Sequence, residues 1–527
     1  LVARAFSRAA ALIERIIEPQ LVKNEYRTLR RWIEQLPEEA LHTYPTLCLV
    51  YALAILFTSD RRAPATLALL QAPLEMAEQA WRADGNWHKL GEVLAVRAMA
   101  IWWQGDFSQA FTAAREALEW LPEHEPQWRG VCLSFVGVEE LLAGKLNAAR
   151  QTILEARALN EAAGNIHGIL STTFILGDVC ARQGELRQAA QLYRRVIAAA
   201  EEVEQEEPLD DKGGALIGLG ALAFEWNDLE TAEQYASQAL DIGRQLGAED
   251  LLVPASLILA RVQHARGEGA RAQQLLHALV AQIPQPRRPS LLREVRAGQA
   301  RLALDASDTT AVQRWYTSHA RHGDDIPLIQ QEQETLIAAR MLIAQQEAGA
   351  ALGLLDRWQA EAHAQGRIGS ELEILLLQAL AHFANKKLPQ ARETLSEVLA
   401  LAQPEGYRRL FLDEGEAMAA LLRAALPDVR EEPLVMYVRS LLHAFTQERP
   451  GEGATAPPAP SPLIEPLSSQ EQRVLRLLAA GLSNPEIAQE LIVSINTIKT
   501  QVKSIYRKLD VHSRQEARDV AHHLKLL

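Results

Sequence analysis

SNPEIA at residues 483–488 and SINTIKTQVK at residues 494–503 have the pattern of two short helices joined by a tight turn. Ser483 and Glu486 have the spacing of a capping box, in which a Ser and a Glu side chain satisfy free backbone N–H groups at a helix start. Ser494 offers the hydroxyl expected of a second helix cap. The pattern therefore predicts two consecutive helices that begin at these serines.

Two more helices are predicted around this pair. The preceding helix spans residues 469–480 and ends at Gly481, because glycine readily takes the positive φ that follows a helix. Its inner face consists of Val474, Leu475, Leu477 and Leu478, and the inner face of the next helix consists of Ile487, Ala488 and Leu491, with Val493 filling the turn. A fourth helix, residues 513–524, carries a small apolar strip made of Ala517, Val520, Ala521 and Leu524. This strip is a candidate dimerisation surface, and a core-facing position is the alternative.

The helix predicted from Ser494 onward has two different faces. At about 100° per residue, its apolar residues form one narrow stripe: Ile498, Val502, Ile505 and Leu509. The opposite face carries Asn496, Lys499, Thr500, Lys503 and Arg507. Such donors on one helix face can contact base edges and phosphates in the major groove of DNA. A solvated polar face is the alternative, but the caps and the tight turn favour a DNA-reading helix.

Upstream, residues 1–445 have helical periodicity and an internal repeat. Each copy begins directly after a turn that often contains Gly or Asn. A small or apolar residue then occurs three positions after the first residue of the copy. The copies begin at Phe107, Leu146, Leu186, Leu229, Gly269, Thr309, Gly349 and Leu388, with Ala110, Ala149, Ala189, Ala232, Ala272, Val312, Leu352 and Ala391 as the later residues. Successive spacings are 39, 40, 43, 40, 40, 40 and 39 residues. This period fits helix pairs that stack into a superhelix, related to the shorter tetratricopeptide repeat (TPR), in which each repeat contacts only its neighbours.

A proline-rich stretch separates the repeats from the C-terminal helices. Six prolines fall between Pro450 and Pro466, so no helix can continue through it and a flexible linker is predicted. The predicted organisation is all-α: a helical-repeat domain (1–446), a linker (447–465) and a four-helix domain (466–527) whose helix-turn-helix motif spans 484–503. The net charge is −13, but residues 466–527 contain nine Lys and Arg against six Asp and Glu, which is +3 and leaves −16 elsewhere. Only the C-terminal domain is therefore expected to contact DNA.

The remaining composition favours a cytoplasmic protein. Cys48, Cys132 and Cys180 are far apart and have no metal-ligand spacing, which is typical of buried thiols in a reducing compartment. The longest apolar run, residues 47–57, is too short to span a bilayer and predicts a buried helix. No set of residues suggests catalysis, so an enzyme is not expected, and no metal site is expected.

Residues 467–517 resemble the DNA-binding domain of the LuxR/FixJ family. The matching residues are Leu467, Glu471, Val474, Leu475, Leu478, Ala479, Gly481, Ser483, Asn484, Glu486, Ile487, Ala488, Leu491, Ser494, Thr497, Lys499, Ile505, Lys508, Leu509, Val511 and Arg514. The resemblance implies base contacts from Lys499, Thr500 and Lys503. It implies contacts to the DNA backbone from Asn484, Ser494 and Thr497. Gln501 and Arg507, which lies on the outward face of the helix, are further candidates for backbone contacts. The sequence departs from the family pattern at Gln470, Arg473 and Gln501, where arginine, glutamate and histidine are usual.

The rest of the chain resembles the large MalT-like regulators of that family. The resemblance rests on LxxWxxxLP at 29–37, PxL at 45–47 and GYRRLFLDEG at 406–415. In such proteins an ATPase domain precedes the repeats, whereas this sequence has no GxxxxGK[ST] loop. The chain is therefore expected to correspond to the C-terminal part of such a regulator. It is expected to hold no cofactor, and ATP is relevant only if an upstream ATPase domain exists in the native protein.

These observations predict a transcription regulator, with activation as the expected direction. Double-stranded DNA is the expected partner of the C-terminal domain, and an unknown small-molecule or protein effector is the expected partner of the repeats. RNA polymerase is a candidate partner, a dimer or oligomer is expected on DNA, and no membrane association is expected. The alternative is a helical-repeat interaction scaffold whose C-terminal domain does not bind DNA.

Overall fold

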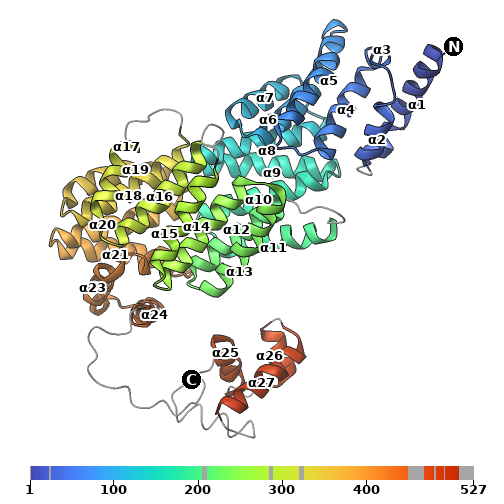
Figure 1. The fold of residues 1–527 in the computed structure, drawn as a ribbon. Helices are drawn as coiled ribbons and strands as arrows, with labels where there is room; N and C mark the ends of the chain where they lie inside the picture. Colours follow the sequence, from blue (N-terminus) through green and yellow to red (C-terminus); the bar gives the residue numbers. More distant parts are fainter. Residues whose placement is uncertain are drawn as a thin grey trace. The chain divides into compact units, whose positions relative to one another are not determined.

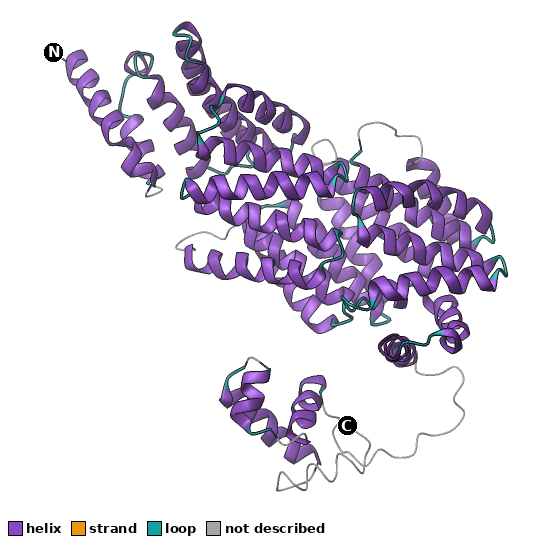
Figure 2. Ribbon diagram, turned by 180° about the vertical axis from the view of Figure 1, so that it is seen from behind, coloured by secondary structure: helices purple, strands orange, loops and turns teal. Residues whose placement is uncertain are grey.

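The computed structural model describes residues 2–22, 25–203, 210–283, 289–319, 326–448, 468–479, 482–491 and 493–509. Within these ranges the regular elements are helices, as Figure 2 shows. The chain divides into two compact units, Leu1–Arg449 and Pro450–Leu527.

The first unit contains the repeats, which are eight consecutive helix pairs (Figure 1). The pairs are α6(Trp87–Gln104) with α7(Phe107–Trp120), α8(Pro126–Leu142) with α9(Leu146–Ala162), α10(Ile166–Arg182) with α11(Leu186–Val203), α12(Asp210–Glu225) with α13(Leu229–Leu246), α14(Glu249–Ala265) with α15(Gly269–Gln282), α16(Pro289–Asp305) with α17(Thr309–His319), α18(Leu328–Ala344) with α19(Ala348–Ala364), and α20(Ile368–Ala384) with α21(Leu388–Ala402). They are numbered repeats 1 to 8 below. The predicted period of about forty residues is therefore confirmed.

The turn inside each repeat contains one residue with positive φ, two positions before the second helix begins. In repeats 1, 2, 3 and 5 this residue is glycine, as predicted: Gly105, Gly144, Gly184 and Gly267, with φ of 84°, 72°, 80° and 82°. In the other repeats it is Asn227, Ser307, Gln346 or Lys386, with φ between 59° and 66°. The backbone conformation thus repeats more faithfully than the glycine does.

The structure corrects the register of the seventh repeat. Its second helix begins at Ala348, two residues after Gln346, so Gly349 lies inside the helix rather than at its start. The residue three positions into the helix is then Ala351 instead of Leu352. At this position all eight repeats have a fully buried residue, and seven of the eight are alanine: Ala110, Ala149, Ala189, Ala232, Ala272, Val312, Ala351 and Ala391. A small side chain here lets the paired helices approach closely.

Five helices precede the repeats: α1(Val2–Val22), α2(Tyr26–Ile33), α3(Glu38–Leu41), α4(Pro45–Thr58) and α5(Pro64–Ala83). The apolar run at 47–57 lies in α4 and is mostly buried, as predicted. Cys48, Cys132 and Cys180 are buried free thiols, as predicted. Among the described residues, no helix combines the length and apolar character needed to cross a bilayer.

Short helices follow the last repeat: α22(Arg409–Leu412), α23(Gly415–Ala425), a 3₁₀ turn (Leu426–Asp428) and α24(Glu432–Glu448). Gln447, which was placed in the predicted linker, belongs to α24. The remainder of that linker, residues 449–465, lies outside the described residues.

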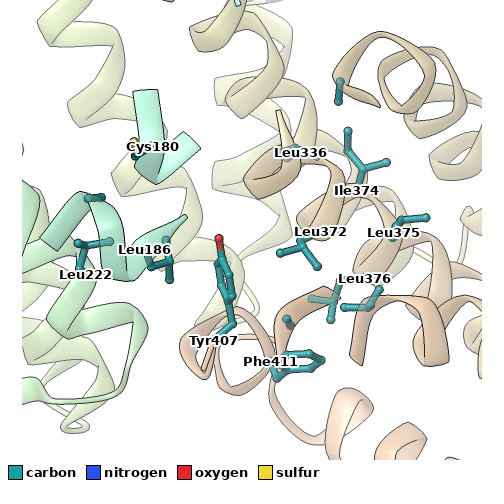
Figure 3. Packing of buried hydrophobic residues seen from close by; sticks show 14 of the residues in the cluster. Cys180, Leu186, Leu222, Leu336, Leu372, Ile374, Leu375, Leu376, Tyr407 and Phe411 are labelled. Atoms are coloured by element: carbon teal, nitrogen blue, oxygen red, sulfur yellow. The ribbon is translucent and has the colours of Figure 1, made fainter. Parts of the chain in front are cut away.

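Repeats far apart in sequence share one apolar core. Cys180, Leu186 and Leu222 of repeats 3 and 4 belong to the same buried cluster as Leu336 and Leu372 of repeats 7 and 8. Figure 3 shows Tyr407 and Phe411 among these side chains. The prediction that repeats contact only their neighbours is therefore wrong, because superhelical winding brings the C-terminal end of the array against its middle.

Candidate nucleic-acid interface

Three described helices form the second unit: α25(Ser469–Ala479), α26(Asn484–Glu490) and α27(Ile495–Leu509). They occupy the positions predicted for the first three helices of the C-terminal domain. Their shared core consists of Val474, Leu475, Leu478, Ile487, Ala488, Ile498, Val502 and Ile505. The apolar stripe predicted for the third helix therefore packs on the first two helices, and this orients the opposite face outward.

Two capping boxes begin α25 and α26. The Ser483 backbone N–H donates to Glu486 Oε2 at 2.7 Å, and the Ser483 hydroxyl donates to the same oxygen at 2.6 Å. At α25 the arrangement is reciprocal, since Ser468 N–H donates to Glu471 at 2.7 Å and Glu471 N–H donates to the Ser468 hydroxyl at 3.2 Å. At Ser483 the Glu half of the predicted box is confirmed, and the Ser483 hydroxyl pairs with the Glu486 carboxylate. The complete box at Ser468 was not predicted.

Glu471 also joins the first helix to the third. Its Oε1 accepts a hydrogen bond from the Ser504 hydroxyl of α27 at 2.6 Å, and its side chain is buried. A buried carboxylate needs such donors, because its desolvation is costly without them. Glu471 therefore fixes the orientation of α27 as well as the start of α25.

The turn between α26 and α27 is closed by backbone and side-chain hydrogen bonds. Val493 N–H donates to the Ala488 carbonyl at 3.0 Å, and Thr497 N–H donates to the Ser494 hydroxyl at 3.1 Å. Ser494 therefore caps the start of α27, as predicted. Val493 does not fill the turn, because it is 41% exposed, and the neighbouring Ile495 is 46% exposed. These two apolar side chains lie at the exposed start of α27.

The predicted base-contacting residues lie on the exposed side of α27. Lys499, Thr500 and Lys503 are exposed, whereas Ile498 and Ile505 have no exposed area. Within the described part of this unit, neither lysine forms an ion pair with a carboxylate. The side chains of Asn496 and Arg507 lie outside the description, although both residues belong to α27.

The residues expected to contact the DNA backbone lie near the two helix starts. Asn484 is the first residue of α26 and is partly exposed. The exposed hydroxyls of Ser494 and Thr497 lie 2.8 Å apart at the start of α27. Helix N-termini favour anions, because free N–H groups and the helix dipole both point toward them. Asn484 at the start of α26, and Ser494 and Thr497 at the start of α27, are therefore placed where a phosphate could bind.

Two departures from the family pattern contact each other. Gln501 of α27 donates from Nε2 to Gln470 Oε1 of α25 at 3.0 Å. The sequence comparison singled out both residues, but nothing in the sequence links positions 31 residues apart. This hydrogen bond orients the Gln501 amide at the edge of the exposed face.

The candidate dimerisation residues lie outside the described residues. These residues are Ala517, Val520, Ala521 and Leu524. The predicted fourth helix, residues 513–524, and Gly481, which was predicted to end the first helix of this domain, also lie outside the described residues.

Fold and site together define a helical-repeat protein that carries a helix-turn-helix domain. Residues 91–428 match the family described as "MalT-like TPR region", and residues 465–521 match "Bacterial regulatory proteins, luxR family". The chain belongs to the MalT-like family, with a LuxR-family domain at its C-terminal end.

Similar proteins include the HTH-type transcriptional regulator MalT of Serratia proteamaculans, which is 25% identical over 94% of this chain. MalT of Vibrio campbellii and of Klebsiella pneumoniae are each 26% identical, over 94% and 96% of the chain. The chain spans 56% of the length of each of these relatives. Among solved structures, a Rap protein complexed with competence and sporulation factor shares the fold, with a TM-score of 0.52 and 11% identity over 69% of this chain and 99% of that one.

Proposed function

We propose that this chain is a transcription regulator that binds duplex DNA through α27 and acts as an activator. The observation that carries the proposal is the exposed face of Lys499, Thr500 and Lys503, set opposite the buried stripe of a capped helix-turn-helix. The relatives named as transcriptional regulators support it. In this proposal the repeats receive the signal, from a small molecule or a protein.

DNA binding is tested with the full chain and a duplex enriched from a random-sequence pool. Each phosphate neutralised should contribute about −0.9 to the slope of log K against log salt concentration. Lys503→Ala should weaken binding and reduce the slope, whereas Arg476→Ala removes another exposed cation, from α25, and should change binding much less. Equal losses for both variants would show that general charge, and not the α27 face, attracts DNA.

The alternative is an interaction scaffold with a C-terminal domain that does not bind DNA. It predicts no enrichment of any duplex and no salt-dependent binding. With α24 ending at Glu448, we also propose the domain boundaries 1–448, 449–465 and 466–527, which limited proteolysis tests. Early cleavage within 449–465 that leaves two resistant fragments is the expected result.

A further inference from the structure

The C-terminal end of the array lies against the turns of repeats 2, 3 and 4. Arg367 Nη1 donates to the Gly144 carbonyl at 3.2 Å, and Arg409 Nη1 donates to Asn227 Oδ1 at 3.0 Å. A Cβ added at Gly184 would lie 3.0 Å from Ile368, and one added at Gly144 would lie 2.9 Å from Arg367. At Gly267 of repeat 5, a Cβ would meet nothing within 4 Å. The close approach is thus found at the turns of repeats 2 and 3 and not at the turn of repeat 5.

The segment at residues 405–414, called the latch here, is attached to repeat 4 along its backbone. Arg408 N–H donates to the Glu225 carbonyl at 3.0 Å, and Leu410 N–H donates to Glu225 Oε1 at 2.9 Å. The Trp226 indole N–H donates to the Glu405 carbonyl at 2.9 Å. These bonds connect residues about 180 positions apart, so they form only when the array is wound.

The acidic end of the latch lies among three arginines that recur with the repeat period. Arg261, Arg301 and Arg340 each stand six residues before the positive-φ residue of repeats 5, 6 and 7. Arg261 lies 3.3 Å from Asp413 Oδ2, and Arg301 donates to the Asp413 carbonyl at 2.7 Å. Arg340 lies 2.7 Å from Glu414 Oε1. Two adjacent carboxylates of the latch therefore connect three successive repeats.

Burial and the arginines balance differently at the two latch carboxyls. Burial opposes ionisation of Asp413, but the guanidinium groups of Arg409, Arg261 and Arg301 overcome it and lower the pKa of the carboxyl. Glu414 has only 8% of its side chain exposed and pairs with Arg301 and Arg340, and there burial outweighs Arg301 and raises the pKa of the carboxyl. Removing one partner from a buried ion pair is costly, because the remaining charge is left uncompensated. Loss of the latch carboxylates should therefore release this end.

The latch directly precedes α23 and α24, the last described helices of the first unit. We propose that residues 405–414 are a releasable electrostatic latch that holds the segment leading into α23 and α24 on repeats 4–7 and thereby sets the DNA affinity of the full chain. The link to DNA affinity rests on the proposed function, whereas the latch itself does not.

Hydrogen exchange of the full chain tests the latch. In Asp413→Asn/Glu414→Gln, amides of α22, α23 and α24 should exchange at least tenfold faster, with α9 unchanged. Asp428→Asn is the matched control, because Asp428 lies between α23 and α24 and forms an exposed pair with Arg392. Arg340→Gln breaks the same contact from the repeat side and replaces the double variant if that fails to fold. Unchanged exchange in α22–α24 would overturn the latch.

DNA affinity is measured with the same proteins and one enriched duplex. The latch variants should change the Kd of the full chain by at least threefold, whereas Asp428→Asn should not change it. Faster exchange with an unchanged Kd would overturn the regulatory part of the proposal. Absence of DNA binding by the wild-type chain would overturn the proposed function and that regulatory part, while the exchange result would still decide whether the latch exists.

Discussion

Cations have opposite roles in the two units. In the repeats, Arg301, Arg340 and Arg367 are turned inward and paired with carboxylates of other helices. On α27, Lys499 and Lys503 are exposed on the side away from the core. The same kind of charge thus stabilises the wound array in one unit and is available to a polyanion in the other. The inward, paired cations are arginines and the exposed ones are lysines, so residue type, burial and partners all differ between the two roles.

The sharpest test of this contrast is Arg367→Ala. Arg367 and Glu332 are 1% and 3% exposed and lie 2.9 Å apart, so the substitution leaves a buried uncompensated carboxylate. We expect a loss of about 3–5 kcal/mol in the free energy of unfolding. All ten tryptophans lie between Trp32 and Trp358, so tryptophan fluorescence during urea unfolding reports on the first unit alone. Arg150→Ala, at a half-exposed pair with Glu185, should cost about 0–1 kcal/mol. Equal losses at the two sites would remove the contrast.

The converse test is Lys499→Ala/Lys503→Ala. Each substitution should weaken binding to the enriched duplex by about 1–3 kcal/mol if the lysine reads a base. Helicity should stay unchanged, because neither side chain contacts the core. Binding is measured by fluorescence anisotropy at fixed salt concentration. A double variant that binds like the wild type, with normal helicity, would show that this face does not read DNA.

Two glycines that look alike in sequence should respond differently to alanine. Gly267→Ala should lower the free energy of unfolding by about 1 kcal/mol, because a residue with a Cβ is disfavoured at positive φ. At Gly144→Ala the new Cβ also overlaps Leu328 at 2.8 Å and Arg367 at 2.9 Å, which should add about 1–3 kcal/mol. Urea unfolding measures both. Equal losses would mean that Leu328 and Arg367 do not pack closely against the turn of repeat 2 at Gly144.

The wound array should be more stable at pH 6.5 than at pH 8. Burial raises the pKa of Glu225 to about 7, well above its ordinary value of 4.5. The folded state then keeps a proton that the unfolded chain loses above pH 4.5, so stability falls as the pH rises toward 7 and levels off above it. Between pH 8 and 6.5 the gain is on the order of 0.5 kcal/mol for this group.

Three more carboxyls act in the same direction, because burial raises their pKa to about 7 as well: Asp211, Glu294 and Glu373. Below pH 6.5 the effect is opposed, since burial lowers the pKa of His167 and disfavours the folded state in acid. Thermal unfolding followed by tryptophan fluorescence gives the pH dependence. Glu225→Gln should make stability depend less steeply on pH. An unchanged pH dependence would show that the Glu225 carboxyl does not contribute to it.

The smallest expected effect concerns the Gln470–Gln501 hydrogen bond in the second unit. Gln501→Ala and Gln470→Ala should each weaken DNA binding, and the double variant should be no weaker than the Gln501 variant alone. The coupling energy should be about 0.5 kcal/mol, as for an exposed neutral hydrogen bond. Additive losses would show that Gln470 does not position Gln501.

Much of the fold could be predicted from the sequence, because it depends on short-range patterns. The Ser483–Glu486 cap, the stripe through Ile498, Val502 and Ile505, and the forty-residue period each involve residues close together in the chain. Local capping and helical periodicity act within a turn or two of helix, and for that reason a sequence displays them directly. The one error of register, at Gly349, arose because glycine was taken as the marker of a turn that Gln346 makes.

The sequence by itself therefore determined that the chain is a helical-repeat array joined to a helix-turn-helix domain with a basic outer face. Only the tertiary structure decided which distant residues meet: Arg367 with Gly144, Glu225 with Leu410, and Gln470 with Gln501. In the array these meetings depend on the small rotation added by each successive repeat, which accumulates over several repeats before two segments touch. The accumulated rotation depends on several repeats together, so it cannot be inferred from any short segment of the sequence. The motif at 406–415 was thus visible as a pattern, but its place against the arginines of repeats 5–7 was set by the winding of the array.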